Sequence, residues 1–208
     1  MVTKAKAGVI IGALVIAIIA VGLLLTWRMV GRGFSTRDEP TPIETFLARR
    51  VRSLATPRAA RDEKNPVMGS EEVLSEAMAH FADHCATCHA NDGSGDTAIG
   101  KGLYPKPPDL RKSDTQELSD GELYYIIHNG VRLTGMPAFG EEVSGKSDLD
   151  SWKLVHFIRH LPNITPEEVN KMESMNPKSP AELKEEEAIE KFLRGEDVEP
   201  PESTHKHD

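Results

Sequence analysis

The chain has two cysteines in 208 residues, and both lie in the stretch Cys85-Ala86-Thr87-Cys88-His89. Two thiols three positions apart can add to the two vinyl groups on one edge of a porphyrin, and an imidazole directly after them can ligate the iron. C-x-x-C-H is the attachment signature of c-type haem. A chain that carries a flat, rigid group in this way has to fold round it, which constrains the fold more than any other feature.

Two other kinds of site use paired cysteines. A redox-active dithiol is expected beside a β-α-β pattern, and the sequence near residues 85–88 has no such pattern. A structural zinc site would need further ligands, which only the other histidines can supply. We predict one covalent haem c, with the zinc and dithiol sites as open alternatives.

Charge divides the chain into three parts. Residues 1–69 carry eleven Lys/Arg and five Asp/Glu, residues 70–161 carry eight and fifteen, and residues 162–208 carry six and thirteen, giving net charges of +6, −7 and −7. The basic residues lie away from the cysteine motif, and the protein as a whole is acidic. This distribution is unfavourable for nucleic-acid binding, so we predict no nucleic-acid partner.

An uncharged stretch of 21 residues runs from Ala7 to Trp27, between lysines and arginines. At about 1.5 Å per residue such a helix is about 31 Å long, enough to cross a bilayer core of about 30 Å. A cleaved signal peptide is the alternative, but its apolar core is shorter and ends in an A-x-A-like site. We predict an uncleaved, single-pass membrane anchor through residues 7–27, whose flanking charges leave its orientation open.

The segment that follows, residues 33–69, has four prolines and many charges, which is typical of a linker. Apolar residues between Ile43 and Leu54 recur near helical spacing among several arginines. They predict a short basic amphipathic helix. This helix can lie on anionic lipid headgroups or pack on the globular domain, and the sequence does not decide between them.

Helical patterns and loops alternate in the rest of the chain, and no strand-like alternation of any length occurs. Ser70 is the expected N-cap of a helix that runs into the cysteine motif. Ser119 and Glu122 form a capping box for a second helix. Asp148 or Asp150 caps a third helix, which Pro162 ends. The predicted fold class is all-α.

One methionine stands out, in a loop defined by glycine and proline. Met136 precedes Pro137, which restricts its backbone, and it follows the cysteine motif within the expected domain. A haem iron ligated by one histidine needs a sixth ligand, and methionine is one of the groups that supply it. Met136 is the candidate, although a single methionine more often serves in packing.

Taken in chain order, these features resemble a class I c-type cytochrome, and they are most similar to the small bacterial haem-c modules grouped with cbb3-oxidase cytochrome subunits. The resemblance covers about residues 70–161. It rests on Cys85, Cys88, His89, the Pro108-Asp109-Leu110 segment, Met136-Pro137 and the terminal aromatic helix.

The resemblance implies a role for each of these residues. His89 and Met136 would be the axial ligands of the iron, the Pro108 carbonyl would accept a hydrogen bond from the His89 ring, and Leu110 would pack on the porphyrin. The first and last helices would cross through Ala77, Phe81 and Phe157. His156 departs from the pattern, because this fold usually has a smaller or less polar residue there.

Four parts follow from these patterns. We expect an anchor in residues 1–32, the linker with its basic helix in 33–69, and a cytochrome c domain folded round one haem in 70–162. The acidic extension, residues 163–208, is expected to be partly disordered with one surface helix over 181–193.

The predicted function is the transfer of single electrons by a membrane-tethered carrier that is not an enzyme and takes no small-molecule substrate. Its partners would be the bilayer, through residues 7–27, and redox proteins of a respiratory chain. Thioether formation in the resembled family takes place outside the bacterial cytoplasm, which implies a haem domain on the periplasmic or outer side of the inner membrane. The alternatives are a haem-c subunit of a larger respiratory or metal-resistance complex, and a gas sensor or small oxidoreductase if Met136 does not ligate the iron.

The remaining histidines form pairs that can also hold a metal ion. Two pairs have the i, i+4 spacing that places both rings on one helix face. H-x-x-x-H without an internal Glu is not the zinc-protease motif, so a metal is the less favoured interpretation. The pairs are His80/His84, His156/His160 and, in the tail, His205/His207.

Overall fold

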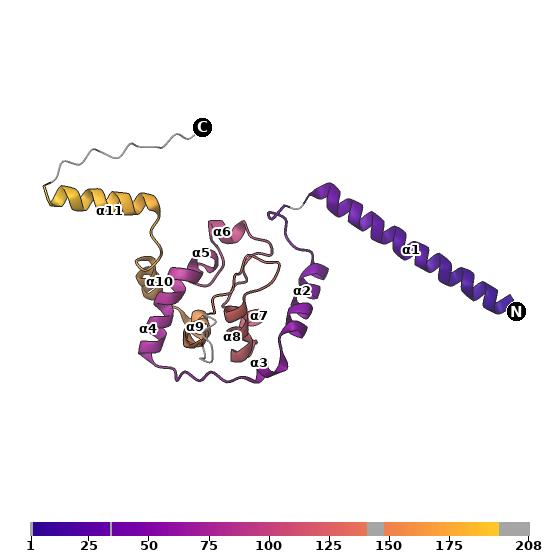
Figure 1. Ribbon diagram of the computed structural model, residues 1–208, viewed down its shortest axis with the longest axis horizontal. Coiled ribbons are helices and arrows are strands. Elements are labelled where there is room, and N and C mark those ends of the chain that lie inside the picture. The colour runs from indigo at the N-terminus through magenta and orange to yellow at the C-terminus, as the bar shows by residue number, and fades with distance from the viewer. Residues whose placement is uncertain (1, 34, 141–147, 196–208) are drawn as a thin grey trace, which may run out of the picture.

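The computed structural model describes residues 2–33, 35–140 and 148–195, and within these ranges all regular structure is helical (Figure 1). The all-α prediction is confirmed. The longer helices are α1 (Val2–Arg32), α2 (Pro42–Ala55), α4 (Glu71–His80), α8 (Asp120–Asn129), α9 (Leu149–His160), α10 (Pro166–Glu173) and α11 (Pro180–Leu193). The short ones are α3 (Arg58–Asp62), α5 (Ala86–His89), α6 (Ala98–Lys101) and α7 (Ser113–Gln116), with a π-helical turn at Phe81–Cys85 and a 3-10 turn at Leu161–Asn163.

The core of the domain is the crossing of α4 with α9, against which α8 packs. Phe81, at the end of α4, and Phe157 on α9 are fully buried, and their ring centroids lie 5.0 Å apart. Ala77 is buried beside them and leaves room for the close approach of the two helices. The first and last helices therefore cross as the resemblance implies.

Side-chain caps set where these helices begin. Ser70 accepts a hydrogen bond from the Val73 amide, and Ser119 forms a capping box with Glu122, so both predicted starts are confirmed. Of the two aspartates proposed for α9, Asp148 is the cap, since its side chain accepts from the Ser151 amide. Each cap satisfies an amide that has no partner inside its own helix.

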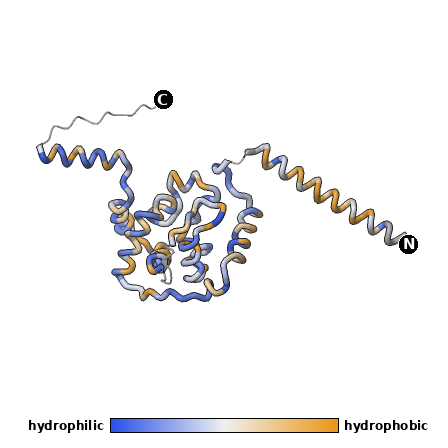
Figure 2. Tube along the Cα trace, viewed as in Figure 1, coloured by the Kyte–Doolittle hydropathy of each residue, from blue (hydrophilic) through white to orange (hydrophobic). Residues whose placement is uncertain are grey.

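Helix α1 contains a stretch, Lys6–Gly31, that is long and apolar enough to cross a membrane. Figure 2 shows apolar residues along most of its length, and Figure 1 shows it projecting away from the helical domain. The apolar N-terminal helix expected from the sequence is therefore present.

Helix α2 lies against the domain and turns its polar side toward it. Thr56 just after its end is buried and Arg52 is half-buried, whereas Ile43 and Leu54 are 73% and 81% exposed. The next helix, α3, packs on α8, where the Ser119 hydroxyl donates to the Arg61 carbonyl at 2.8 Å. The predicted basic helix thus contacts the globular domain while its apolar side remains free.

The C-terminal part continues from the core and then leaves it. Met172 on α10 is fully buried and belongs to the same core as α9. Helix α11 covers the predicted surface helix and has no buried residue. His205 and His207 lie outside the described residues.

Candidate cofactor site

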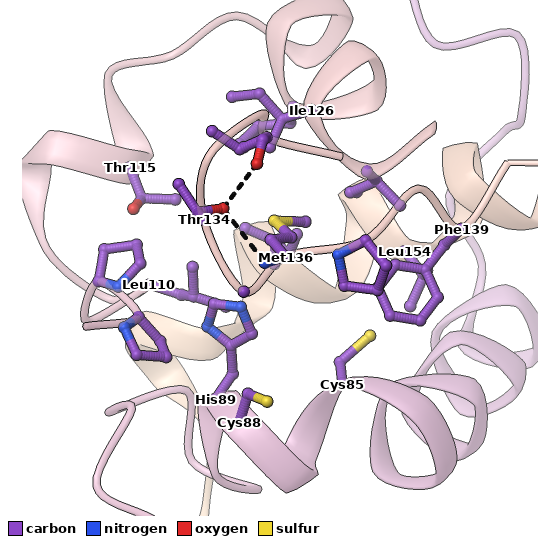
Figure 3. Close-up of a pocket in the computed structure, with 18 of the residues that line it drawn as sticks. Cys85, Cys88, His89, Leu110, Thr115, Ile126, Thr134, Met136, Phe139 and Leu154 are labelled. Carbon is purple, nitrogen blue, oxygen red and sulfur yellow. Dashed lines mark hydrogen bonds between the residues drawn. The ribbon is translucent and has the colours of Figure 1, made fainter. Parts of the chain in front are cut away.

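The cysteine motif lies where α4 passes through the π-helical turn into α5. The turn ends with the Ala86 amide bonded to the Phe81 carbonyl, and a π turn inserted in a helix often marks a functional site. Cys85, Cys88 and His89 line the same pocket, and both thiols are free (Figure 3). The imidazole of His89 projects from the end of α5 toward the interior of that pocket.

The pocket is lined mostly by apolar side chains and opens to solvent. It brings together every site residue predicted from the sequence: Cys85, Cys88, His89, Pro108, Leu110 and Met136. Ile126, Ile127 and Phe139 extend its apolar wall. Such a lining keeps water from a bound apolar group.

The loop after the motif is held by its own backbone and by one arginine. The Gly95 amide donates to the His89 carbonyl, and the Leu110 amide donates to the Gly93 carbonyl, each at 2.8 Å. These bonds bring the segment that carries Leu110 back beside the motif.

Arg111 joins the two ends of this loop. Its guanidinium reaches Asp92 at 2.8 Å and holds Asp109 through two bonds of 2.8 and 3.0 Å. The hydrogen bond from Arg111 lowers the pKa of Asp109 to about 2. These ion pairs therefore hold Pro108, which precedes Asp109, at the pocket wall.

His89 provides a test of whether the pocket suits a haem. Its Nδ1 is buried and has no hydrogen bond of good geometry with any described residue. Burial lowers the pKa of His89, and the Pro108 carbonyl, the backbone acceptor beside the ring, acts in the opposite direction. A neutral imidazole with its ring between an acceptor and an apolar cavity is suited to ligate iron. The residues present fit the group that the motif implies.

Hydrogen bonds fix the loop that carries Met136 onto α8. The Met136 amide donates to the Thr134 hydroxyl at 3.1 Å, and the Val131 amide donates to the Met136 carbonyl at 3.1 Å. The Phe139 amide then bonds the Ile127 carbonyl. Gly130 begins the loop at φ 66°, a conformation that favours glycine. Met136 consequently lines the pocket in a defined loop, and Figure 3 shows it facing the same space as His89.

The two alternative sites for the cysteines gain no support. Burial, and then the neighbouring Cys88, raise the pKa of Cys85 to about 12, whereas redox dithiols and zinc ligands need a stabilised thiolate. Across the described part of the chain, no three His, Cys, Asp or Glu side chains come together as a metal cluster.

The paired histidines of the helices have partners of their own. His156 bonds the Val67 carbonyl at 2.9 Å, and His160 bonds Glu168 at 2.9 Å. His80 and His84 contact each other, with ring centroids 4.9 Å apart. The bond to Val67 also explains how α9 accommodates His156, because a linker residue satisfies the ring.

Arg52 is a pocket residue that sequence reasoning missed. It belongs to α2, which the sequence assigns to the linker, and its spacing matches the other arginines of a basic helix. Thr115 and Leu118 also line the pocket without any sequence signal. Only the tertiary packing of α2 and of the segment around α7 brings these side chains to the site.

Comparison with known families identifies the domain. The family described as cytochrome C oxidase, cbb3-type, subunit III matches residues 72–158, which contain the cysteine motif, the Met136 loop and the crossing helices. None of the curated proteins compared with the chain matches it. Residues 72–158 therefore form a class I c-type cytochrome domain, a kind of domain that binds haem c covalently.

Proposed function

We propose that this protein is a membrane-tethered carrier of single electrons, with one haem c attached through Cys85 and Cys88 and ligated by His89 and Met136. The observation that carries the proposal is that all four side chains line one apolar pocket within a cytochrome c domain. When bound, haem c supplies an iron that takes up and releases one electron.

The two proposed ligands determine what the site does. His89 and Met136 would hold the iron and leave no position on it for a substrate, so the protein would transfer electrons and catalyse no reaction. A methionine ligand also raises the reduction potential, because it favours the ferrous state. Pro108 would orient the His89 ring through its carbonyl, and Leu110 would pack on the porphyrin face.

The proposed location is the outer side of a bacterial inner membrane, with α1 as the single span. Thioether attachment in such domains takes place outside the cytoplasm, which supports this orientation. Helix α2, whose apolar side is exposed, begins ten residues after the end of α1, close to where a bilayer would lie. We propose that this side of α2 rests on the membrane surface, as amphipathic helices with basic residues do.

A second candidate is a haem-c subunit of a larger respiratory or metal-resistance complex. The family description, which names an oxidase subunit, favours it. Mild solubilisation of the membranes separates the two candidates, since an independent carrier migrates alone and a subunit migrates with its complex.

Mass spectrometry and a ligand substitution test the proposal. The intact mass should show one covalently added haem, and the ferric protein should show the charge-transfer absorption of methionine-ligated iron. Met136→Ala should remove that absorption, lower the reduction potential and allow carbon monoxide to bind the ferrous protein. Met68→Ala is the matched control, because Met68 is 87% exposed and lies outside the pocket.

Two results would contradict this function. A protein without added haem mass is no cytochrome. A haem protein whose spectrum and potential are unchanged by Met136→Ala does not use this methionine, and carbon monoxide binding by the unsubstituted protein would then favour a gas sensor.

A further inference from the structure

Arg52 enters the wall of the haem pocket from outside the cytochrome domain. It lies on α2, and the family match begins only at residue 72. Its side chain is half-buried and lines the same pocket as Cys88 and His89.

Among the described residues, the Arg52 guanidinium makes no hydrogen bond and no ion pair. The carboxylates of Glu122 and Asp114 act on it only from a distance, and they pair directly with Arg61 and Arg49. A half-buried cation without a direct partner is costly, and its presence in a cofactor pocket points to an anion that belongs there.

The other two arginines of α2 behave differently. Arg49 forms an ion pair with Asp114 at 2.6 Å, outside the pocket. Arg50 lies on the outward side, with its guanidinium 5.6 Å from the centre of the Phe46 ring. Of the three arginines on this helix, only Arg52 lines the cofactor site.

Several contacts hold Arg52 in this position. Besides the ion pair of Arg49, Glu44 near the start of α2 accepts a hydrogen bond from the Tyr104 hydroxyl. At the other end, buried Thr56 donates to the Arg52 carbonyl at 3.1 Å. The bond between Thr56 and Arg52 lies within the helix end, so the contacts of Glu44 and Arg49 and the burial of Thr56 set how α2 docks and where Arg52 points.

The charges of Asp114 and Glu122 act on Arg52, so its side chain lies on their side of the pocket. Arg49 of the same helix pairs with Asp114, whose neighbour Thr115 lines the pocket. Figure 3 shows Thr115 across the pocket from Cys85. Thioether bonds hold the vinyl edge of a haem at the cysteines, and the two propionate carboxylates extend from the porphyrin edge away from the vinyl groups. A cation on the Thr115 side is thus on the side of the carboxylates.

We infer that Arg52 is the cationic partner of a haem propionate. This inference rests on the proposed function, because it requires an attached haem. It makes α2 part of the haem site rather than a passive linker, so that the segment next to the membrane anchor also sets the charge beside the cofactor. Guanidinium and carboxylate form strong, charge-assisted hydrogen bonds in such a half-buried setting.

The reduction potential of the full-length holoprotein, measured across pH, tests this inference. A nearby positive charge favours the ferrous state, so Arg52→Gln should lower the potential. The same substitution should raise the pKa of the propionate by about 1–3 units. The pH range over which the potential changes should move upward by the same amount. Arg52→Lys keeps the charge and should restore most of both properties.

Arg50→Gln is the matched control, with the same change of charge on the same helix. It should leave the potential and its pH dependence unchanged. Equal behaviour of Arg52→Gln and Arg50→Gln would overturn the inference, as would an Arg52→Lys variant that behaves like Arg52→Gln while its helical circular dichroism is unchanged. If Arg52→Gln fails to fold, Arg52→Met takes its place, because it also removes the charge while keeping most of the apolar stem, and the same shifts in potential and propionate titration are expected.

The intact mass and the methionine charge-transfer absorption are recorded on every variant. If the unsubstituted protein carries no covalently attached haem, the proposed function itself is refuted. Attached, methionine-ligated haem with an unchanged potential in Arg52→Gln would refute only the role of Arg52.

Discussion

Two helices of 14 residues, α2 and α11, flank the cytochrome domain and begin in the same way. Each has a capping box with proline in its first turn, Thr41 with Glu44 in α2 and Ser179 with Glu182 in α11. Neither helix has a buried residue. Their surroundings nevertheless differ, since α2 is docked on the domain and α11 makes its ion pairs with residues close in the chain, such as Lys191 with Glu187.

The charges of the two helices divide in the same way. Helix α2 carries three arginines and one glutamate, and it faces a domain with a net charge of −7 over residues 70–161. Helix α11 carries two lysines and five glutamates, so it has the same sign as the domain. Two helices with equivalent local signals thus reach different tertiary positions, and long-range charge favours the docking of α2 and opposes that of α11.

The largest expected effect comes from breaking the contact that docks the α2–α3 segment. A methyl group on Gly121 would lie 1.9 Å from the Ala60 carbonyl oxygen, a backbone atom that cannot move alone. Gly121→Ala should therefore cost about 3 kcal/mol of unfolding free energy, measured by denaturant titration of the holoprotein. Released from the domain, α2 should also be cut faster by trypsin at Arg49, whereas cleavage at Lys184 in α11 should not change.

Gly102→Ala serves as the control, because its added methyl group would have its nearest neighbour at 3.3 Å. Equal stability of the two alanine variants would show that α3 does not need its close approach to α8.

A smaller effect on the free energy of unfolding is expected when one ion pair of the domain, Asp109 with Arg111, is titrated with acid and compared with an ion pair of the tail. Arg111 lowers the pKa of Asp109 to about 2 from an ordinary 3.8, so this carboxylate stabilises the fold above pH 4 and loses that contribution as the pH falls toward 2. Asp109→Asn should cost about 1–2 kcal/mol at pH 7 and flatten the loss of stability between pH 4 and 2.

The matched variant in the tail is Glu187→Gln. Lys191 lowers the pKa of Glu187 through a hydrogen bond, but this pair is open to solvent, where screening removes most of its effect. Unfolding followed across pH should show no change in Glu187→Gln. A loss as large as that of Asp109→Asn would mean that α11 is coupled to the domain.

The smallest effect belongs to the surface ion pair of α2. Arg49 and Asp114 are about half exposed, at 54% and 53%, so Arg49→Ala should cost about 0.5 kcal/mol at low salt and less at high salt. Thermal unfolding at two salt concentrations measures this. A cost that does not depend on salt would indicate that packing rather than charge docks α2.

The local features of the fold could be predicted because they depend on residues a few positions apart. The caps Ser70, Ser119 and Asp148 were recognisable since each side chain reaches an amide only three residues ahead. The tail helix was recognisable from its alternating Glu and Lys, which is also a local pattern. The π-helical turn before the cysteines was not, because it replaces ordinary helical bonds without a distinctive composition.

The candidate site divides in the same way. The cysteine motif and Met136 could be singled out by residue type, spacing and loop chemistry, although their roles at the iron remain proposals. Arg52, Thr115 and the bond between His156 and Val67 had no such signal. They come from segments far apart in the chain, and their proximity depends on how those segments pack.

By itself, the sequence determined the chemistry that the chain can offer a haem, the helical class of the fold and the apolar helix at the N-terminus. These follow from covalent spacing, capping and periodicity, which act within one or two helical turns. Only the tertiary structure decided that α2 docks while α11 does not, and that Arg52 faces the cofactor pocket. Docking depends on charge and shape summed over distant segments, and no local pattern contains that sum.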